Sequence, residues 1–371
     1  MTGLRTVFRR SSLLLMLIFL LSCSGKDPVV IGFLGSLSGP NADLGEAGRN
    51  GALLAVEDYN KAGGIKGRPV KVVVKDHQMS PEQLSHISGE FTRAGVDVVI
   101  GPYTSVMTRI MIPIAEAKDM LLISPTASSS EFFEKDDNLI RLNHTTSENS
   151  RVYTAYLAAA DVMSCSVIYD TQNAEFTESW LNDFAGSYEA AGGRILVRER
   201  INSKLDTDFS EELNSVIDSG AEMLLIIANS IDSATLVQQL RQTGSDLQVY
   251  FSEWAGTRQL IELGGKAVEG SIVMQSFDPF DESPQFQEFR DKYKQRYQRE
   301  PSFASVLSYD ACSVLFQALE GRSRNQTVKE AILLNGPYTG IQEPLNISEF
   351  GDTRRKNVFS VIREGQFRKI E

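Results

Sequence analysis

Short apolar runs of strand length alternate with longer amphipathic segments along most of this chain, and this alternation constrains the fold more than any other feature. Parallel strands buried on both faces read as continuous apolar runs, and the helix after each strand returns the chain to the next one. We therefore expect an α/β protein built on doubly wound parallel sheets. In the first half, the expected strands are 29–34, 70–74, 96–100 and 120–123, and the expected helices are 46–61, 81–94 and 105–118.

The same alternation restarts near residue 148, which predicts a second lobe of the same kind. Its expected helices are 148–160, 178–191, 209–219 and 233–243, and its expected strands are 165–169, 194–198, 223–228 and 249–251. After Gly270 the expected elements are a strand, two helices and a last strand, at 272–275, 284–298, 304–319 and 357–362. Because these late elements must join sheets already begun, we expect two discontinuous lobes joined by a hinge of several crossovers. We place lobe 1 at 29–146 plus 277–346, and lobe 2 at 147–276 plus 347–371.

The first residues of the chain have the layout of a bacterial export signal. Three arginines precede an apolar run at 13–21, which is shorter than the roughly 20 residues that span a bilayer. The end of this run resembles a lipobox, which implies cleavage before Cys23 and lipidation of its sulfur. We therefore expect a signal peptide at 1–22, a lipidated tether at 23–28, and a protein anchored on the periplasmic side of a bacterial membrane or on the cell surface. The alternatives are an ordinary signal peptide with a chance cysteine, or an uncleaved anchor.

Charge and cysteine content narrow the possible functions. The formal net charge is −11, and an acidic surface argues against nucleic acid, whose phosphates need clustered Lys and Arg. Beyond Cys23, only Cys165 and Cys312 remain; they could pair, but their distant positions favour two buried free thiols. The histidines show no metal-ligand spacing, and no nucleophile elbow, phosphate loop or dinucleotide motif is present. We therefore expect no enzyme activity, no metal and no cofactor, and a monomer.

The loops that follow the expected strands are rich in hydroxyl, glycine and acidic residues. These loops are 35–40, 101–105, 124–130, 169–170, 229–230 and 252–254. Ligands of doubly wound sheets bind at the C-terminal ends of the strands, so these loops are the candidate ligand site.

Together with neighbouring segments, the loops resemble the leucine/isoleucine/valine-binding family of type I periplasmic solute-binding proteins. The segments that carry the resemblance are 31–40, 50–52, 60–67, 100–105, 123–128 and the loops at Asp170 and Glu253. They run in the family's order across essentially the whole mature chain. The resemblance implies that an amino-acid-like ligand is held between the lobes, with its carboxylate on hydroxyls and backbone N–H groups near helix N-termini.

Carried over by position, the resemblance assigns the ligand carboxylate to Ser105, Thr126 and Ser128, and the ligand ammonium to Glu253. Thr126 would contribute its backbone, and the two serines their hydroxyls. A carboxylate that faces an ammonium in a dry cleft makes a strong, charge-assisted hydrogen bond. The structural alternatives are that Ser128 merely caps the next helix and that Glu253 is an ordinary surface acid.

The side-chain part of the site departs from the family pattern. An aromatic position of the family falls on Leu44, one tyrosine falls on Phe176, and another falls on Asn229, whose amide could bond a polar ligand group. Tyr103 and Trp254 are further candidate walls, or simply packing residues. These changes imply an amino-acid-like ligand with a polar or larger side chain rather than leucine specifically.

The resemblance implies the substrate receptor of an ABC importer, which closes around its ligand and docks on membrane permease subunits. The alternative is a ligand sensor, or a lipoprotein of the same fold that regulates cell-wall synthesis. The retained Ser105, Ser128 and Glu253 argue against a version of this fold that binds no small ligand.

Overall fold

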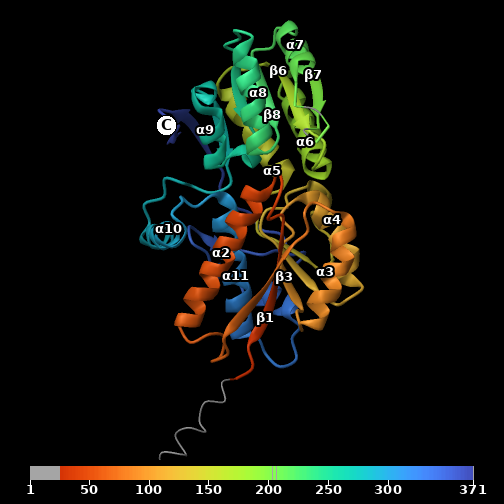
Figure 1. Cartoon of the computed structure of the whole chain (residues 1–371), viewed down its shortest axis with the longest axis vertical. Coiled ribbons are helices and arrows are strands. Elements are labelled where there is room, and N and C mark those ends of the chain that lie inside the picture. Colours follow the sequence, from red (N-terminus) through yellow and green to blue (C-terminus); the bar gives the residue numbers. More distant parts are fainter. Residues whose placement is uncertain (1–25, 203, 206, 371) are drawn as a thin grey trace, which may run out of the picture.

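Two separate β-sheets form the centres of two lobes in the computed structural model, which describes residues 26–202, 204–205 and 207–370. The lobes stand one above the other along the long axis of the molecule, with helices covering both faces of each sheet (Figure 1). The prediction of two doubly wound α/β lobes is confirmed.

The sheet of the first lobe has the strand order β2-β1-β3-β4-β5, and all of its strands are parallel. Its strands are β1 (Val29–Gly35), β2 (Val70–Asp76), β3 (Val98–Ile100), β4 (Leu121–Ser124) and β5 (Leu139–Arg141). Its helices are α2 (Ala42–Lys61), α3 (Pro81–Arg93) and α4 (Ser105–Glu116), joined later in the chain by α10 (Pro284–Tyr297), α11 (Phe303–Gly321) and α12 (Val328–Leu334). A two-stranded ribbon of β11 (Tyr338–Thr339) and β12 (Pro344–Leu345) follows.

The sheet of the second lobe has the order β14-β13-β10-β9-β8-β6-β7. Its strands are β6 (Ser164–Asp170), β7 (Arg194–Ile201), β8 (Met223–Ile227), β9 (Gln248–Phe251), β10 (Ile272–Gln275), β13 (Val358–Arg363) and β14 (Gln366–Lys369). Its helices are α5 (Thr146–Ala159), α6 (Ala174–Ala190), α7 (Ser210–Asp218), α8 (Ser230–Gln242) and α9 (Arg258–Gly264). Short 3-10 turns are η1 (Ser130–Phe132) in the first lobe, and η2 (Glu253–Ala255) and η3 (Gly265–Val268) in the second.

Five strands differ from the sequence expectation, and two of them are the two-residue strands β11 and β12, which were not expected. β5 was not expected because it has only three residues, and β14 was not expected because its sequence, Gln-Phe-Arg-Lys, is mostly polar and exposed at the sheet edge. β13 was expected, but it pairs antiparallel with β10, so the C-terminal edge of the second sheet is not parallel.

The chain passes between the two sheets three times: from β5 to β6, from β10 to α10, and from β12 to β13. The second sheet therefore pairs β10 with β13 from much later in the sequence, and the first lobe receives α10, α11 and α12 from late in the chain. These crossovers form the multi-segment hinge connection that the late elements predicted.

Close packing of α2 against α11 ties the first and last parts of the first lobe together. A side chain at Gly51 of α2 would place its Cβ only 2.1 Å from the backbone oxygen of Ser305 in α11, so glycine is needed for this approach. α11 is buried over most of its length and begins at Phe303, beside the space between the lobes. None of the helices in the described residues is both long and apolar enough to cross a bilayer.

The two cysteines of the described residues are free and buried, Cys165 on β6 and Cys312 on α11. They lie in different lobes, so the prediction of two free thiols is confirmed. Burial raises the pKa of Cys165 to about 12, which leaves its thiol protonated and unreactive.

Candidate functional site

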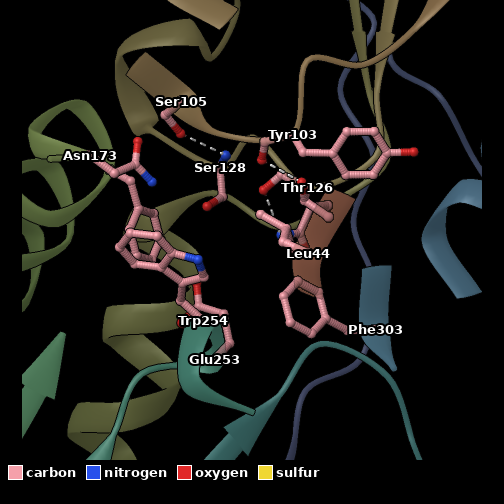
Figure 2. Close-up of a pocket in the computed structure, with 11 residues that line it drawn as sticks. Leu44, Tyr103, Ser105, Thr126, Ser128, Asn173, Glu253, Trp254 and Phe303 are labelled. Atoms are coloured by element: carbon pink, nitrogen blue, oxygen red, sulfur yellow. Dashed lines mark hydrogen bonds between the residues drawn. The ribbon is translucent and has the colours of Figure 1, made fainter. Parts of the chain in front are cut away.

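A pocket lies where the C-terminal ends of the central strands of both lobes face each other. The strand order reverses between β1 and β3 in one sheet and between β6 and β8 in the other, and such reversals open a crevice above the strands. The loops after β3, β4, β5, β6 and β9 all reach this crevice, together with the starts of α2 and α11. The residues that line the pocket are Leu44, Tyr103, Ser105, Thr126, Ser128, Asn143, Asn173, Phe176, Glu253, Trp254 and Phe303 (Figure 2).

Seven of the eight side chains that the sequence placed in a ligand site line this one pocket: Tyr103, Ser105, Thr126, Ser128, Phe176, Glu253 and Trp254. They come from both lobes and from positions up to about 150 residues apart in the sequence. The fold therefore brings this set together.

Asn229 is the residue that the structure does not bring to the pocket lining. Its Oδ1 accepts hydrogen bonds from the backbone N–H groups of Ile231 and Asp232, and its Nδ2 donates to the Asp232 carboxylate. Both ends of the amide are thus used to cap α8, because an Asn just before a helix satisfies N–H groups that lack partners within the helix. The expected contact between Asn229 and a ligand does not fit this geometry.

Hydroxyl groups gather at the N-terminus of α4 on the first lobe. The Oγ of Ser105, the first residue of α4, accepts hydrogen bonds from the backbone N–H groups of Ser128 and Ser129, at 3.3 and 3.4 Å. The Ser128 hydroxyl makes no hydrogen bond within the described part of the chain, and Figure 2 shows it directed into the pocket. The cap of the following turn is Ser129, whose hydroxyl accepts from the N–H of Glu131, so the capping alternative for Ser128 is wrong.

Thr126 and Tyr103 hold two neighbouring loops of the first lobe together. The Thr126 hydroxyl donates to the backbone oxygen of Tyr103, and the phenol of Tyr103 shares a 2.6 Å hydrogen bond with the Ser308 hydroxyl. The carbonyl oxygen of Thr126 accepts a 3.2 Å hydrogen bond from Nδ2 of Asn143. Since the Tyr103 hydroxyl is already bonded, this residue offers the pocket its ring rather than its polar end.

Glu253 stands on the opposite lobe, at the start of the turn η2 after β9, and is 2% exposed. Its Oε1 accepts a 2.7 Å hydrogen bond from Nδ2 of Asn149, and its Oε2 accepts one of 3.1 Å from Nε1 of Trp180. Both donors are neutral, and among the described residues no cationic side chain pairs with this carboxyl group. Burial therefore raises the pKa of Glu253 to about 7. The alternative of an ordinary surface acid is wrong.

The remaining wall of the pocket is apolar. Leu44 and Phe303 lie together on the side away from Ser105 and Asn173, as Figure 2 shows. Trp254 packs edge-to-face against Phe176, with ring centroids 5.5 Å apart. The pocket thus has a hydroxyl corner, a carboxyl group on the facing lobe, and an aliphatic and aromatic wall.

Residues 28–344 match the family model described as periplasmic binding protein. The chain belongs to this family. It is 27% identical over 314 residues, 83% of each chain, to the leucine-, isoleucine-, valine-, threonine- and alanine-binding protein of Pseudomonas aeruginosa.

Two solved structures show how closely the fold of this periplasmic binding protein follows known ones. The branched-chain amino acid transporter substrate binding protein LivJ of Streptococcus pneumoniae, in complex with isoleucine, superposes with a TM-score of 0.85 at 23% identity, covering 92% of this chain and 98% of that one. A solute-binding protein of an ABC transporter from R. palustris, in complex with benzoate, gives 0.82 at 17% identity, covering 92% and 95%.

Polar contacts between the lobes of this periplasmic binding protein flank the pocket on both sides. On one side, the hydroxyls of Ser230 and Thr257 donate across the gap to Oδ2 of Asp43 on α2, at 3.1 and 3.3 Å. On the other side, Arg109 on α4 forms an ion pair with Glu175 on α6. The two lobes are therefore in contact around the pocket, in a closed arrangement.

Three lining residues were missed in the sequence: Asn143, Asn173 and Phe303. Asn143 follows β5, so recognising that short strand would have placed it at a strand end. Asn173 follows β6, and its Oδ1 accepts a 3.1 Å hydrogen bond from the N–H of Val106 at the start of α4. Phe303 arrives from a distant helix, and no local signal marks it.

The described residues hold no group of three or more His, Cys, Asp or Glu side chains that could bind a metal ion. His77 and His144 are buried, and burial lowers their pKa values to about 4 and about 3, so both are neutral near pH 7. The periplasmic binding protein family consists of solute-binding proteins of transporters rather than of enzymes.

Proposed function

We propose that this protein binds a small α-amino acid between its lobes and delivers it to an ABC importer. The observation that carries the proposal is Glu253, a buried carboxyl group held only by neutral donors in a pocket whose far corner carries the hydroxyls of Ser105 and Ser128. A buried carboxylate without a counter-ion is unfavourable, whereas an ammonium in the pocket would neutralise it. The ligand would supply that ammonium.

The α-carboxylate of an amino acid suits the hydroxyl corner formed by Ser105 and Ser128. The α-carboxylate would accept hydrogen bonds from Ser105 and Ser128 and from the backbone N–H of Thr126. The N-terminus of α4 adds a favourable dipole for an anion, since its first N–H groups point toward the pocket end of the helix. An α-amino acid is thus matched at both of its charged ends.

The ligand side chain would lie against Leu44, Phe303 and the ring of Trp254. These groups are apolar, and Asn229 turns its amide away into a helix cap, so an aliphatic side chain fits better than the polar or larger one expected from the sequence. The names of relatives agree with this class, since one binds leucine, isoleucine, valine, threonine and alanine. A ligand such as benzoate, which the R. palustris protein holds, has no ammonium for Glu253.

Binding measurements test this function. Calorimetry should detect binding of leucine, isoleucine, valine, threonine or alanine to the wild-type protein, and benzoate should bind far more weakly. Glu253→Gln should weaken amino-acid binding by at least about 30-fold, because the ammonium is then buried without a charged partner. Glu262→Gln, an exposed acid of α9 in an ion pair with Arg258, is the matched control and should change nothing. Equal affinity of wild type and Glu253→Gln would remove Glu253 from the site.

The anchor and the lobe boundaries belong to the same proposal. Cys23 lies outside the described residues, and its lipidation is supported by the lipobox-like sequence alone. The protein would be a monomer on the periplasmic side of a membrane or on the cell surface, with lobe 1 at 29–146 plus 277–346 and lobe 2 at 147–276 plus 347–371. Cys23→Ala should release it from membranes into the soluble fraction, with loss of labelled palmitate. Retention of the label in that variant would refute lipidation at Cys23.

A further inference from the structure

Asn143 has an unsatisfied hydrogen-bond acceptor in the wall of the pocket. It follows β5, is 4% exposed, and donates from Nδ2 to the carbonyl oxygen of Thr126. That carbonyl can only accept, so the orientation of the amide is determined, and Oδ1 is the end that remains. Within the described part of the chain, Oδ1 has no hydrogen-bond partner.

An acceptor buried without a partner is unfavourable and is rare in folded proteins. Several other buried polar atoms of the described residues also lack partners, but Asn143 is the only one of those residues that lines the pocket. The alternative is that Asn143 has only a structural role. That role explains Nδ2, which holds the Thr126 loop, but it does not explain why Oδ1 has no partner.

We propose that Oδ1 of Asn143 accepts a hydrogen bond from an N–H or O–H group of the bound ligand. This inference rests on the proposed amino-acid ligand and adds a residue to its recognition. An α-ammonium carries three N–H donors, and each oxygen of Glu253 already accepts one hydrogen bond from the protein. The carbonyl oxygen of Thr126 is likewise already bonded to Asn143. Oδ1 is therefore well suited to a second donor of the ammonium, or to a hydroxyl on the ligand side chain.

Valine and threonine distinguish these two donors, because they have nearly the same shape and differ by a methyl group against a hydroxyl group. Calorimetric affinities for both amino acids should be measured with wild type, Asn143→Leu and Asn143→Asp. The Leu variant removes both ends of the amide, whereas the Asp variant keeps an acceptor, loses the donor to Thr126 and adds a negative charge. Thermal unfolding without ligand checks that each variant is folded, and Asn143→Ala replaces Asn143→Leu if the latter does not fold.

A matched control is Asn335→Leu. Asn335 follows α12, away from the pocket lining, and its Nδ2 is also a buried atom with no partner in the described residues. This substitution should leave the affinities for valine and threonine unchanged.

If Oδ1 accepts from the ammonium, Asn143→Leu should weaken both ligands by about 10- to 100-fold, and Asn143→Asp should bind both more tightly than Asn143→Leu does. If Oδ1 accepts from a side-chain hydroxyl, Asn143→Leu should weaken threonine about tenfold and leave valine unchanged. Unchanged affinity for both ligands would overturn the inference. Equal losses in the Leu and Asp variants would also overturn it, because the contact to Thr126 would then explain the effect. A wild-type protein that binds no amino acid would remove the proposed function, and this inference with it.

Discussion

Lowering the pH should weaken amino-acid binding through the protonation of Glu253. Without ligand, burial raises the pKa of this carboxyl group to about 7, so it is mostly protonated below that pH. A bound ammonium favours the ionised carboxylate and lowers its pKa again. Binding below pH 7 must therefore release a proton, and the affinity falls as the pH falls.

The size of the effect follows from that pKa. Well below pH 7, the affinity should fall about tenfold for each pH unit, and the loss between pH 7 and pH 5 should be roughly 50-fold because the group is already half protonated at pH 7. At pH 6, about 0.9 protons should be released for each ligand bound. The folding stability of the ligand-free protein should show the opposite trend. Because folding raises the pKa of Glu253, this group's contribution to the free energy of unfolding is lost as the pH rises from about 4.5, the usual pKa of Glu, to about 7.

Calorimetry in two buffers of different ionisation enthalpy measures both the affinity and the released protons. His77 and His144 do not titrate in this range, because their pKa values are about 4 and about 3. Asp170 does titrate there, since burial raises its pKa to about 6. Glu253→Gln therefore serves as the control, because it keeps Asp170 and removes the carboxyl group at issue. A wild-type affinity that stays flat between pH 5 and pH 8, or an equal slope in the Gln variant, would refute this reasoning.

Three further substitutions test the closed arrangement and the packing. Asp43→Ala should weaken ligand binding about tenfold by calorimetry, because two hydroxyls of the facing lobe lose their shared acceptor; unchanged affinity would mean that this contact does not support closure. Arg109→Ala should speed ligand release only two- to five-fold in stopped-flow measurements, since the Arg109 side chain is half exposed and water screens its ion pair with Glu175, and a much larger change would point to direct contact with the ligand. Gly51→Ala should destabilise the protein by about 1–3 kcal/mol in urea unfolding, because its Cβ would meet the backbone of α11. Gly89→Ala, with only a flexible side chain nearby, should be neutral or stabilising and is its control.

Strand-end loops were recognisable from the sequence because buried strands and their glycine- and serine-rich ends have a local pattern. That pattern placed Ser105, Ser128 and Glu253 in loops, and the structure brings these loops to one pocket. The pattern failed at β5, whose three residues carry too little signal, and so Asn143 was missed. It also failed for Phe303, which reaches the pocket only because α11 packs against α2.

Local sequence could not decide between roles that use the same residue type. Ser128 and Ser129 are adjacent and both could cap a helix, yet only Ser129 does so. Asn229 and Asn143 both follow strands, but the Asn229 amide caps α8, whereas Asn143 lines the pocket and its Oδ1 has no partner among the described residues. Such choices depend on the direction of a side chain and on which N–H groups lie nearby.

The sequence by itself determined the two-lobed α/β architecture, because periodicity and strand-end composition are local properties that each segment carries. It also determined that hydroxyls and one acid would stand at the strand ends. Only the tertiary structure decided that Glu253 is buried among neutral donors and that its pKa is therefore raised. Glu253 is buried against donors on α5 and α6, which lie far from η2 in the sequence, and no local stretch of sequence specifies that burial.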